Sequence, residues 1–361
     1  MNLKTALITL YLILVTAAVG LTQDSTCSQL GVWVWHIEQT GMTHAQLAIN
    51  LSNRDVQRVY VKVADGTNNP SSWPEVVDQQ LVSDYKSQDL SIWGWSYNYP
   101  TSDFTRQADA LYQAAATGYD GFVVDVEMEF DNNPQALDAL FSAFYEAKLR
   151  AIADGHATMD FQLYCTTWGN PKDHLFSISS IDPYVDGFMP QTYVEFWGPS
   201  FVSDITFWIE EGDKEYAELG ATKPIHHIVS TVTEVMTADH INEFISASGP
   251  ETSIWRVPGS SVPFTVWEDW NGIDWNFNFC TPTSTADNFD TDFKLVAYPN
   301  PTSSILNLTK EVEGFNISDV TGQIVLSSNI STDFIDISTL QDGIYVLRVD
   351  ALLHPIMIMK H

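Results

Sequence analysis

The sequence is poor in basic residues, and this excludes several classes of partner. Its 361 residues include 16 Lys and Arg against 46 Asp and Glu, which gives a formal net charge of -30 at pH 7. A charge of this sign opposes binding to phosphate backbones and to anionic lipid surfaces. We therefore expect no nucleic-acid partner and favour a neutral or cationic ligand. The same charge is also typical of a protein that must stay dissolved outside the cell.

Cysteine is scarce as well, with Cys27, Cys165 and Cys280 as the only three in the chain. An odd number leaves at least one thiol unpaired in an exported protein. Cys27 and Cys280 bracket the central region, so they could form a bridge if that region closes on itself, with Cys165 as a buried strand thiol. Three free thiols are the alternative.

Motifs for metals, phosphate-bearing cofactors and serine nucleophiles are missing. The chain has no His-Glu-x-x-His, Cys-x-x-Cys or Gly-x-Ser-x-Gly motif, and no glycine-rich loop follows its first predicted strand. His36, His226 and His227 lack the spacing of a metal site, and a lone strand His is usually satisfied by hydrogen bonds. We expect neither a metal nor a cofactor, and His226 and His227 to open a strand.

Long apolar runs are confined to the amino terminus. Lys4 precedes an apolar run from Ala6 to Val19, and Ala18-Val19-Gly20 fits a small-x-small cleavage site. This pattern predicts an export signal peptide over residues 1–20. No other run approaches the ~18 apolar residues that span a membrane, so we expect no transmembrane segment.

From Gly31 onward, short apolar runs alternate with helical stretches, which is the pattern of parallel strands with crossover helices. Helices are predicted over Thr43–Ser52, Thr105–Thr117 and Pro134–Asp154. The eight predicted strands are Gly31–Ile37, Val59–Val63, Ser91–Tyr97, Gly121–Glu127, Phe161–Thr166, Gly187–Tyr193, Ile225–Val232 and Ser253–Val257. Eight such units predict an α/β fold, a (β/α)8 TIM barrel over residues 27–280, with an open doubly wound sheet as the alternative.

The fourth predicted strand ends in acids. In the segment 120–129, Asp125, Glu127 and Glu129 share one parity and would point to one face of an extended strand. Like charges at this spacing seldom all stay ionised, so one carboxyl is expected to have a raised pKa, as a general acid requires. Ordinary solvated acids at a strand end are the alternative.

Aromatic and polar residues gather at the ends of the other predicted strands. Flat rings beside a carboxylate pair suit a sugar, whose C–H faces stack on aromatics while its hydroxyls need polar partners. A barrel interior filled by Trp and Tyr is the alternative. The predicted substrate-binding residues are Trp35, Trp95, Tyr97, Glu129, Trp168, Gln191 and Glu234.

These residues resemble glycoside hydrolase barrels over about residues 31–277. The run Asp120-Gly121-Phe122-Val123-Val124-Asp125-Val126-Glu127 is similar to the DGxDxDxE signature of family 18, the chitinases and endo-N-acetylglucosaminidases, and residues 189–193 are similar to its Met-x-Tyr region. Val123 stands where that family has its middle Asp, and the Ser-x-Gly-Gly of the third strand is missing. The same segments are also similar to family 25 lysozymes, although the first strand lacks their Asp.

The resemblance implies a secreted hydrolase of a polysaccharide or glycan that contains N-acetylhexosamine. By this resemblance Glu127 would be the general acid, Asp125 would assist by orienting the N-acetyl group or stabilising positive charge, and Tyr193 would position the same group. If the acetamido oxygen is the nucleophile, no carboxylate is needed in that role. The alternative is a non-catalytic carbohydrate-binding or adhesion protein on a degenerate barrel.

The composition changes near Cys280. Residues 281–292 form a small polar linker, and residues 293–361 alternate short apolar runs with turn residues, which predicts a small all-β sandwich. This tail resembles the C-terminal sorting domain of the type IX secretion system, type A. The resemblance implies that the secretion machinery is a partner and that the protein is secreted or held on the outer surface of a Gram-negative bacterium. The matching blocks are Tyr298-Pro299-Asn300-Pro301, Asp319-Val320-Thr321-Gly322-Gln323, Ile335-Asp336-Ile337-Ser338 and Gly343-Ile344-Tyr345-Val346-Leu347.

Overall fold

The computed structural model describes residues 29–68, 73–100, 103–233, 235–259, 261–275, 297–298, 302–319, 323–349 and 356–360. The chain divides into two compact units, Met1–Pro282 and Thr283–His361, and each is treated by itself. The predicted signal peptide, the predicted linker, Cys27 and Cys280 lie outside the described residues. Their predicted roles therefore stay predictions.

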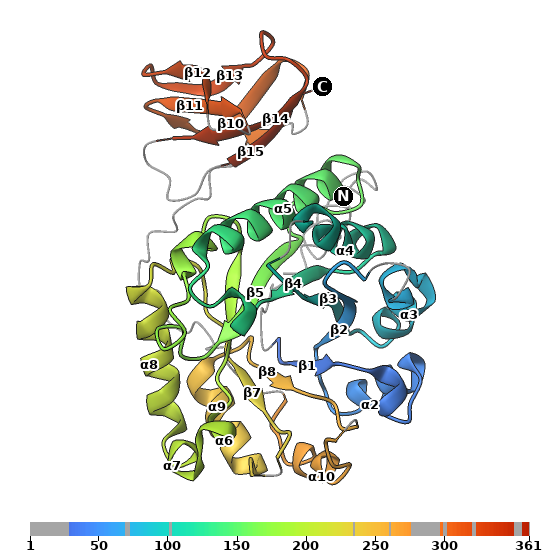
Figure 1. Cartoon of the computed structure of the whole chain (residues 1–361). Coiled ribbons are helices and arrows are strands. Elements are labelled where there is room, and N and C mark those ends of the chain that lie inside the picture. Colours follow the sequence, from blue (N-terminus) through green and yellow to red (C-terminus); the bar gives the residue numbers. More distant parts are fainter. Residues whose placement is uncertain are drawn as a thin grey trace, which may run out of the picture. The chain divides into compact units, whose positions relative to one another are not determined.

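The first unit is built on a closed barrel of eight parallel strands that pair in chain order (Figure 1). Closure is seen at Val32 of the first strand, which faces Val59 on one side and Ile254 of the last strand on the other. The predicted TIM barrel is thus confirmed, and the open sheet was wrong. The strands are β1 (Gly31–Val34), β2 (Arg58–Asp65), β3 (Ser91–Tyr97), β4 (Gly121–Asp125), β5 (Gln162–Trp168), β6 (Gly187–Gln191), β7 (Ile228–Ser230) and β8 (Ser253–Trp255).

Helices follow the strands and cover the barrel (Figure 1). The three helices predicted from the sequence are present, with ends shifted by a residue; Thr43, for example, is the N-cap of α2 and forms a capping box with Gln46. The α-helices are α2 (His44–Ser52), α3 (Gln79–Lys86), α4 (Phe104–Thr117), α5 (Pro134–Ala153), α6 (Val194–Trp197), α7 (Pro199–Val202), α8 (Ile205–Glu218), α9 (Ala238–Ser248) and α10 (Val266–Trp270). Short 3₁₀ helices are η1 (Ile37–Gln39), η2 (Pro74–Val77), η3 (Met128–Phe130) and η4 (Ile178–Ser180).

The strands bury a different core on each face. In β4, Phe122 and Val124 join the apolar layer between sheet and helices, whereas Val123 points into the barrel. The barrel interior is a mainly aromatic cluster, in which Trp33 stacks on Tyr60 with ring centroids 4.6 Å apart. The alternative prediction, that Trp and Tyr fill the barrel interior, is therefore confirmed for the buried rings of this cluster. The buried members of the interior cluster are Trp33, Tyr60, Trp93, Trp95, Val123, Tyr164, Met189 and Ile228.

Five strands end earlier than predicted. Two of them are β7 and β8, which end at Ser230 and Trp255, each two residues early. The prediction carried β1 to Ile37, but the strand ends at Val34 and η1 begins at Ile37. The strands β4 and β6 likewise end at Asp125 and Gln191 rather than two residues later. After β1, β4 and β6 the chain turns into a short helix at the rim of the barrel, and the alternating pattern of side chains ends there.

The second unit contains two antiparallel sheets, of order β13-β10-β9 and β12-β11-β14-β15. The two sheets share one apolar core that includes Leu306, Ile317, Ile335 and Leu347, as expected of a small sandwich. The strands are β9 (Ala297–Tyr298), β10 (Ile305–Val312), β11 (Phe315–Asp319), β12 (Ile324–Ser328), β13 (Thr332–Asp336), β14 (Gly343–Arg348) and β15 (Ile356–Lys360). In the described part of the chain, no helix has the length and apolar character that crossing a lipid bilayer requires.

Candidate active site

A small cavity of about 80 Å³ lies at the carboxyl end of the barrel strands, where barrel enzymes place their active sites. Its volume equals that of only two or three water molecules, so it can take a substituent but not a whole ligand. Two carboxylates, an amide and two hydroxyls converge on it. The lining residues are Trp33, Asp125, Glu127, Thr166, Gln191, Tyr193, Ile228 and Trp255.

The side-chain amide of Gln191 connects the two acids in this cavity. Its Nε2 group donates to Asp125 Oδ1 and to Glu127 Oε1, at 3.1 Å in both cases. Asp125 is held from behind as well, because its backbone carbonyl accepts hydrogen bonds from the backbone N–H and the side chain of Asn98. One amide therefore fixes the relative position of both carboxyl groups.

Burial changes the protonation of both acids. Burial raises the pKa of Asp125 well above its ordinary value, and the charge of Glu127 raises it further. Burial also raises the pKa of Glu127, and the hydrogen bond from Gln191 acts in the opposite direction because it favours the charged form. Lys62 lowers both pKa values, but it is already paired with Asp65 at 2.7 Å. The pair thus keeps a proton at a pH where free carboxyls have lost theirs, as a general acid must.

Glu129 is near the acids but is not on the strand. The prediction of one extended strand through all three acids was wrong, because Glu127 is the N-cap of η3 and Glu129 lies within that helix. Glu129 Oε2 accepts a hydrogen bond of 2.8 Å from the hydroxyl of Tyr97, which is half-buried at the end of β3. This bond places both predicted binding residues at the rim of the barrel.

Thr166 contributes a polar atom without a partner. Its side chain lines the cavity and is 1% exposed, and its Oγ1 has no hydrogen-bond partner among the described residues. An unpaired buried hydroxyl costs free energy unless a ligand or a bound water satisfies it. The hydroxyl of Thr166 is therefore available to a polar group that enters the cavity.

Tyr193 completes the polar lining. It follows β6 as the N-cap residue of α6 and is half-buried. Burial raises the pKa of its phenol well above the ordinary value, and the charges of Asp125 and Glu127 add to the rise. The phenol therefore keeps its proton and can donate a hydrogen bond into the cavity.

Trp168 is fixed at the rim, beside Gln191 on the neighbouring strand. Its ring stacks on that of His174, with centroids 3.8 Å apart and an interplanar angle of 7°. Asp131 holds both rings, because its two oxygens bond to Trp168 Nε1 at 3.0 Å and to His174 Nδ1 at 3.1 Å. The predicted binding residue is thus part of a rigid cluster of three side chains.

The other predicted tryptophans differ in accessibility. Trp35 is half-buried next to β1, with the guanidinium of Arg256 4.7 Å from its ring centroid. Trp95 is 1% exposed inside the barrel, and its indole N–H donates to the carbonyl of Val34. Trp95 therefore packs edge-on against Trp33 and Trp255 of the cavity lining and has no face available for a ligand.

The sequence reasoning missed several residues of the site. Trp33, Ile228 and Trp255 line the cavity, and Asp131 and His174 anchor Trp168. Trp255 carried a usable signal, since it ends the eighth strand as other aromatics end theirs. Asp131 and His174 gave no such signal in the sequence, because their contacts with Trp168 depend on how two separate loops meet.

The neighbouring histidines His226 and His227 contact side chains outside the cavity lining. His227 directly precedes β7, bonding to Thr192 and Asp213, and His226 stacks on Tyr164. Within the described part of the chain, no group of three or more His, Cys, Asp or Glu side chains could hold a metal ion. Glu234, predicted to bind substrate, lies outside the described residues.

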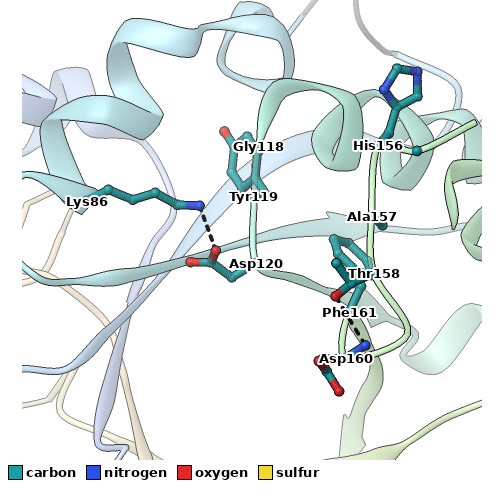
Figure 2. A pocket seen from close by; sticks show the side chains of 10 residues that line it. Lys86, Gly118, Tyr119, Asp120, His156, Ala157, Thr158, Asp160 and Phe161 are labelled. Carbon is teal, nitrogen blue, oxygen red and sulfur yellow. Dashed lines mark hydrogen bonds and ion pairs between the residues drawn. The ribbon is translucent and has the colours of Figure 1, made fainter. Parts of the chain in front are cut away.

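A larger pocket of about 450 Å³ lies away from these acids (Figure 2). It is lined by residues that precede β4 and β5, such as Tyr119 and Phe161, and so belongs to the amino end of the barrel. Lys86 pairs with Asp120 there at 2.7 Å, and the side chain of His156 points away from that pair (Figure 2). None of the predicted site residues lines this pocket, and barrel enzymes rarely use this end.

Comparison with known proteins identifies the C-terminal unit. Residues 296–355 match the family described as "Secretion system C-terminal sorting domain". The tail is a type IX secretion sorting domain. As predicted, the sorting domain directs the protein to the cell surface or the extracellular space. No curated protein matches the chain.

Solved structures resemble the barrel only distantly. The spore cortex-lytic enzyme SleL of Bacillus cereus has a TM-score of 0.47 and 11% identity, over 70% of this chain and 74% of that one. A chitinase of Chromobacterium violaceum has a TM-score of 0.43 and 11% identity, over 68% and 98%. An endo-beta-N-acetylglucosaminidase of Cordyceps militaris has a TM-score of 0.41 and 12% identity, over 68% and 89%. Barrels of other kinds, such as a xylanase and amylase inhibitor, match equally well, so these likenesses do not assign a reaction.

Proposed function

We propose that the barrel is a secreted glycoside hydrolase that cleaves a polysaccharide or glycan containing N-acetylhexosamine. Glu127 is the general acid, Asp125 assists it, and Tyr193 positions the substrate. The observation that carries the proposal is the amide of Gln191, which donates to both carboxyls beside the cavity. The raised pKa of Glu127 lets it hold the proton that the glycosidic oxygen receives when the bond to the sugar breaks.

The arrangement of the acids suggests which group attacks the sugar. Both acids that line the cavity come from the same strand end, and no described lining residue places a carboxylate on the opposite wall. A protein nucleophile or a base for water would stand across the bond that is cleaved. The acetamido oxygen of the substrate takes this role instead, with Asp125 accepting a hydrogen bond from its N–H group.

The cavity suits such a substituent. Its volume of about 80 Å³ is too small for a sugar ring, which must lie above it. An acetamido group that entered would meet the free hydroxyl of Thr166 and the phenol of Tyr193, and its methyl would meet the apolar walls of Trp33 and Trp255. The sugar itself would then lie near the rim, where Trp35, Tyr97 and Trp168 are half-buried.

The test is a reducing-end release assay on the purified protein. The panel contains chitin, peptidoglycan, N-glycan, and neutral and acidic polysaccharides without N-acetylhexosamine. We expect release from at least one N-acetylhexosamine polymer, and loss of that release in Glu127→Gln. Release from none of the panel, or release confined to polymers without N-acetylhexosamine, would contradict the proposal.

One observation favours a non-catalytic alternative. Val123 is fully buried in the barrel interior, next along the inward face from Asp125, at the position where family 18 carries its middle Asp. Asp125 therefore lacks an acidic neighbour within the strand. If this loss ended catalysis, the barrel would bind carbohydrate without cleaving it. The reducing-end assay would then show no release, while a separate titration of the same glycans would show binding.

A further inference from the structure

A second pocket, of about 390 Å³, lies outside the barrel mouth and has the size of a ligand site. Its walls come from the segment after β5, from the short helices α6 and α7, and from one face of α8. None of its described lining residues lines the cavity with Asp125. The lining residues are Gly169, Asn170, Asp173, Trp197, Phe201, Trp208, Glu211, Gly212 and Glu215.

One wall of this pocket is aromatic. Trp197, Phe201 and Trp208 are all half-buried and contact one another, with the rings of Phe201 and Trp208 4.6 Å apart and that of Trp197 nearly perpendicular to that of Trp208, at 80°. Partly exposed Trp and Phe rings cost free energy in water unless something covers them. Because Trp197 is nearly perpendicular to the other two rings, a ligand would stack on one ring of this wall rather than on all three.

The helix α8 carries the polar wall. Trp208, Glu211, Gly212 and Glu215 follow one another at helical spacing, next to the stripe by which the helix packs on the barrel. The glycine in mid-helix is costly, yet a Cβ there would lie 3.1 Å from the ring of His227. Gly212 therefore lets the helix approach closely and keeps Trp208 and the two acids at the pocket.

The chemistry of the lining selects the ligand. No described lining residue is basic, so an anion has no partner here. Each acid of the lining already has one hydrogen-bond or ion-pair partner. Glu211 pairs with Lys214 at 3.2 Å, and Glu215 accepts from the backbone N–H of Lys172. Asp173 accepts from the side chain of Asn170 at 3.1 Å. A carboxylate can accept about four hydrogen bonds, so each keeps capacity for hydroxyl donors.

A cationic amine fits this pocket less well. Recognition of a quaternary ammonium group needs ring faces arranged around the cation. Phe201 and Trp208 contact each other instead and leave no gap for a cation between them. A pyranose ring requires an aromatic ring beside hydroxyl acceptors, and the lining contains both, with Trp208, Glu211 and Glu215 on one helix.

We propose that this pocket is a second carbohydrate-binding site, which holds a neutral sugar unit of a polysaccharide on Trp208 while Asn170, Glu211 and Glu215 bond its hydroxyls. The site stands on its own lining and does not depend on hydrolysis at Glu127. It would let the protein hold a polymer chain at a point separate from the barrel mouth.

The test is calorimetric titration of the full chain in a Glu127→Gln background, which prevents cleavage of the probe. The probes are β-1,4-linked hexasaccharides of N-acetylglucosamine, glucose, xylose and mannose, together with choline chloride as a cation. We expect one hexasaccharide to lose a binding site, or at least tenfold in affinity, when Trp208→Ala is added. The matched control is Phe264→Ala, because this ring is 58% exposed and does not line the pocket.

A second variant controls for misfolding of Trp208→Ala. Asn170→Ala removes a polar group without touching the aromatic wall, and it should weaken the same hexasaccharide while thermal unfolding stays unchanged. Binding of every hexasaccharide unchanged in both variants would overturn the proposal, as would choline binding that Trp208→Ala abolishes. Neither result bears on the reaction, since the reducing-end assay with unmodified Glu127 reports it separately.

Discussion

Gln191 Nε2 lies 3.1 Å from Glu127 Oε1 and donates to it, so the amide favours the charged form of the proposed general acid. Burial raises the pKa of Glu127 by more than this hydrogen bond lowers it, so the pKa is raised overall. The acidity of the site is therefore a balance between one hydrogen bond and desolvation.

Removing the amide tests this balance. Gln191→Leu deletes a donor that stabilises the carboxylate, so the pKa of Glu127 should rise further and its proton should be retained to higher pH. We expect the alkaline limb of the pH profile of kcat/KM to move to higher pH, while kcat falls because the acids lose their common partner. A limb that stays in place or moves to lower pH would contradict this role of Gln191.

The ionisable carboxyl of Asp125 should lower the free energy of unfolding of the protein at neutral pH. The unfolded chain releases this proton near pH 4, whereas the folded protein keeps it to higher pH, so stability falls as pH rises from about 4 through the raised folded pKa. Asp125→Asn cannot ionise and escapes this loss. We expect the variant to lose activity but to gain at least about 2–4 °C in Tm at neutral pH, the effect of 1 kcal/mol in a domain of this size.

The pH dependence provides the control for that gain. At a pH below about 4, both the wild type and Asp125→Asn carry a neutral side chain in folded and unfolded states alike, so their Tm values should converge. A variant less stable than the wild type at neutral pH would show that the carboxyl is held by favourable contacts rather than strained by burial.

The barrel and the acids of the candidate site could be predicted from the sequence, because both depend on local residue patterns. The strand over residues 91–97 could be predicted because it is a short apolar run bounded by polar residues. The acids after Gly121 could be recognised because they alternate with apolar residues. The turn at Glu127 into η3 could not be predicted, because it depends on tertiary packing of Phe130, which is fully buried. The burial of Trp95 could not be predicted either, since the tryptophans of the interior and of the rim share one alternating pattern.

Thr166 offers a test of ligand contact without a cost in stability. Thr166→Val replaces an unpaired buried hydroxyl by a methyl of similar size, so Tm should stay the same or rise. If the hydroxyl bonds the substrate, KM should rise by roughly fivefold, the equivalent of about 1 kcal/mol. A fall in Tm with unchanged KM would instead assign the hydroxyl a structural role.

Asp131 should act on substrate binding through Trp168. Asp131→Ala removes the acceptor that holds the rings of Trp168 and His174, so the proposed rim contact loses its orientation. We expect KM to rise while kcat changes little, because the acids at Gln191 are untouched. Asp138→Ala is the matched control, since Asp138 accepts a hydrogen bond from Tyr184 away from the site, and it should leave both constants unchanged.

The most direct test of the account compares Glu127→Gln on two substrates that carry the same sugar. One is the natural glycan, and the other is a 2,4-dinitrophenyl glycoside, whose leaving group departs without a proton. We predict a loss of about 10²–10⁴-fold on the glycan and a much smaller loss on the aryl glycoside. Equal losses on both substrates would contradict Glu127 as the general acid, and no turnover of either by the wild type would contradict the hydrolase itself.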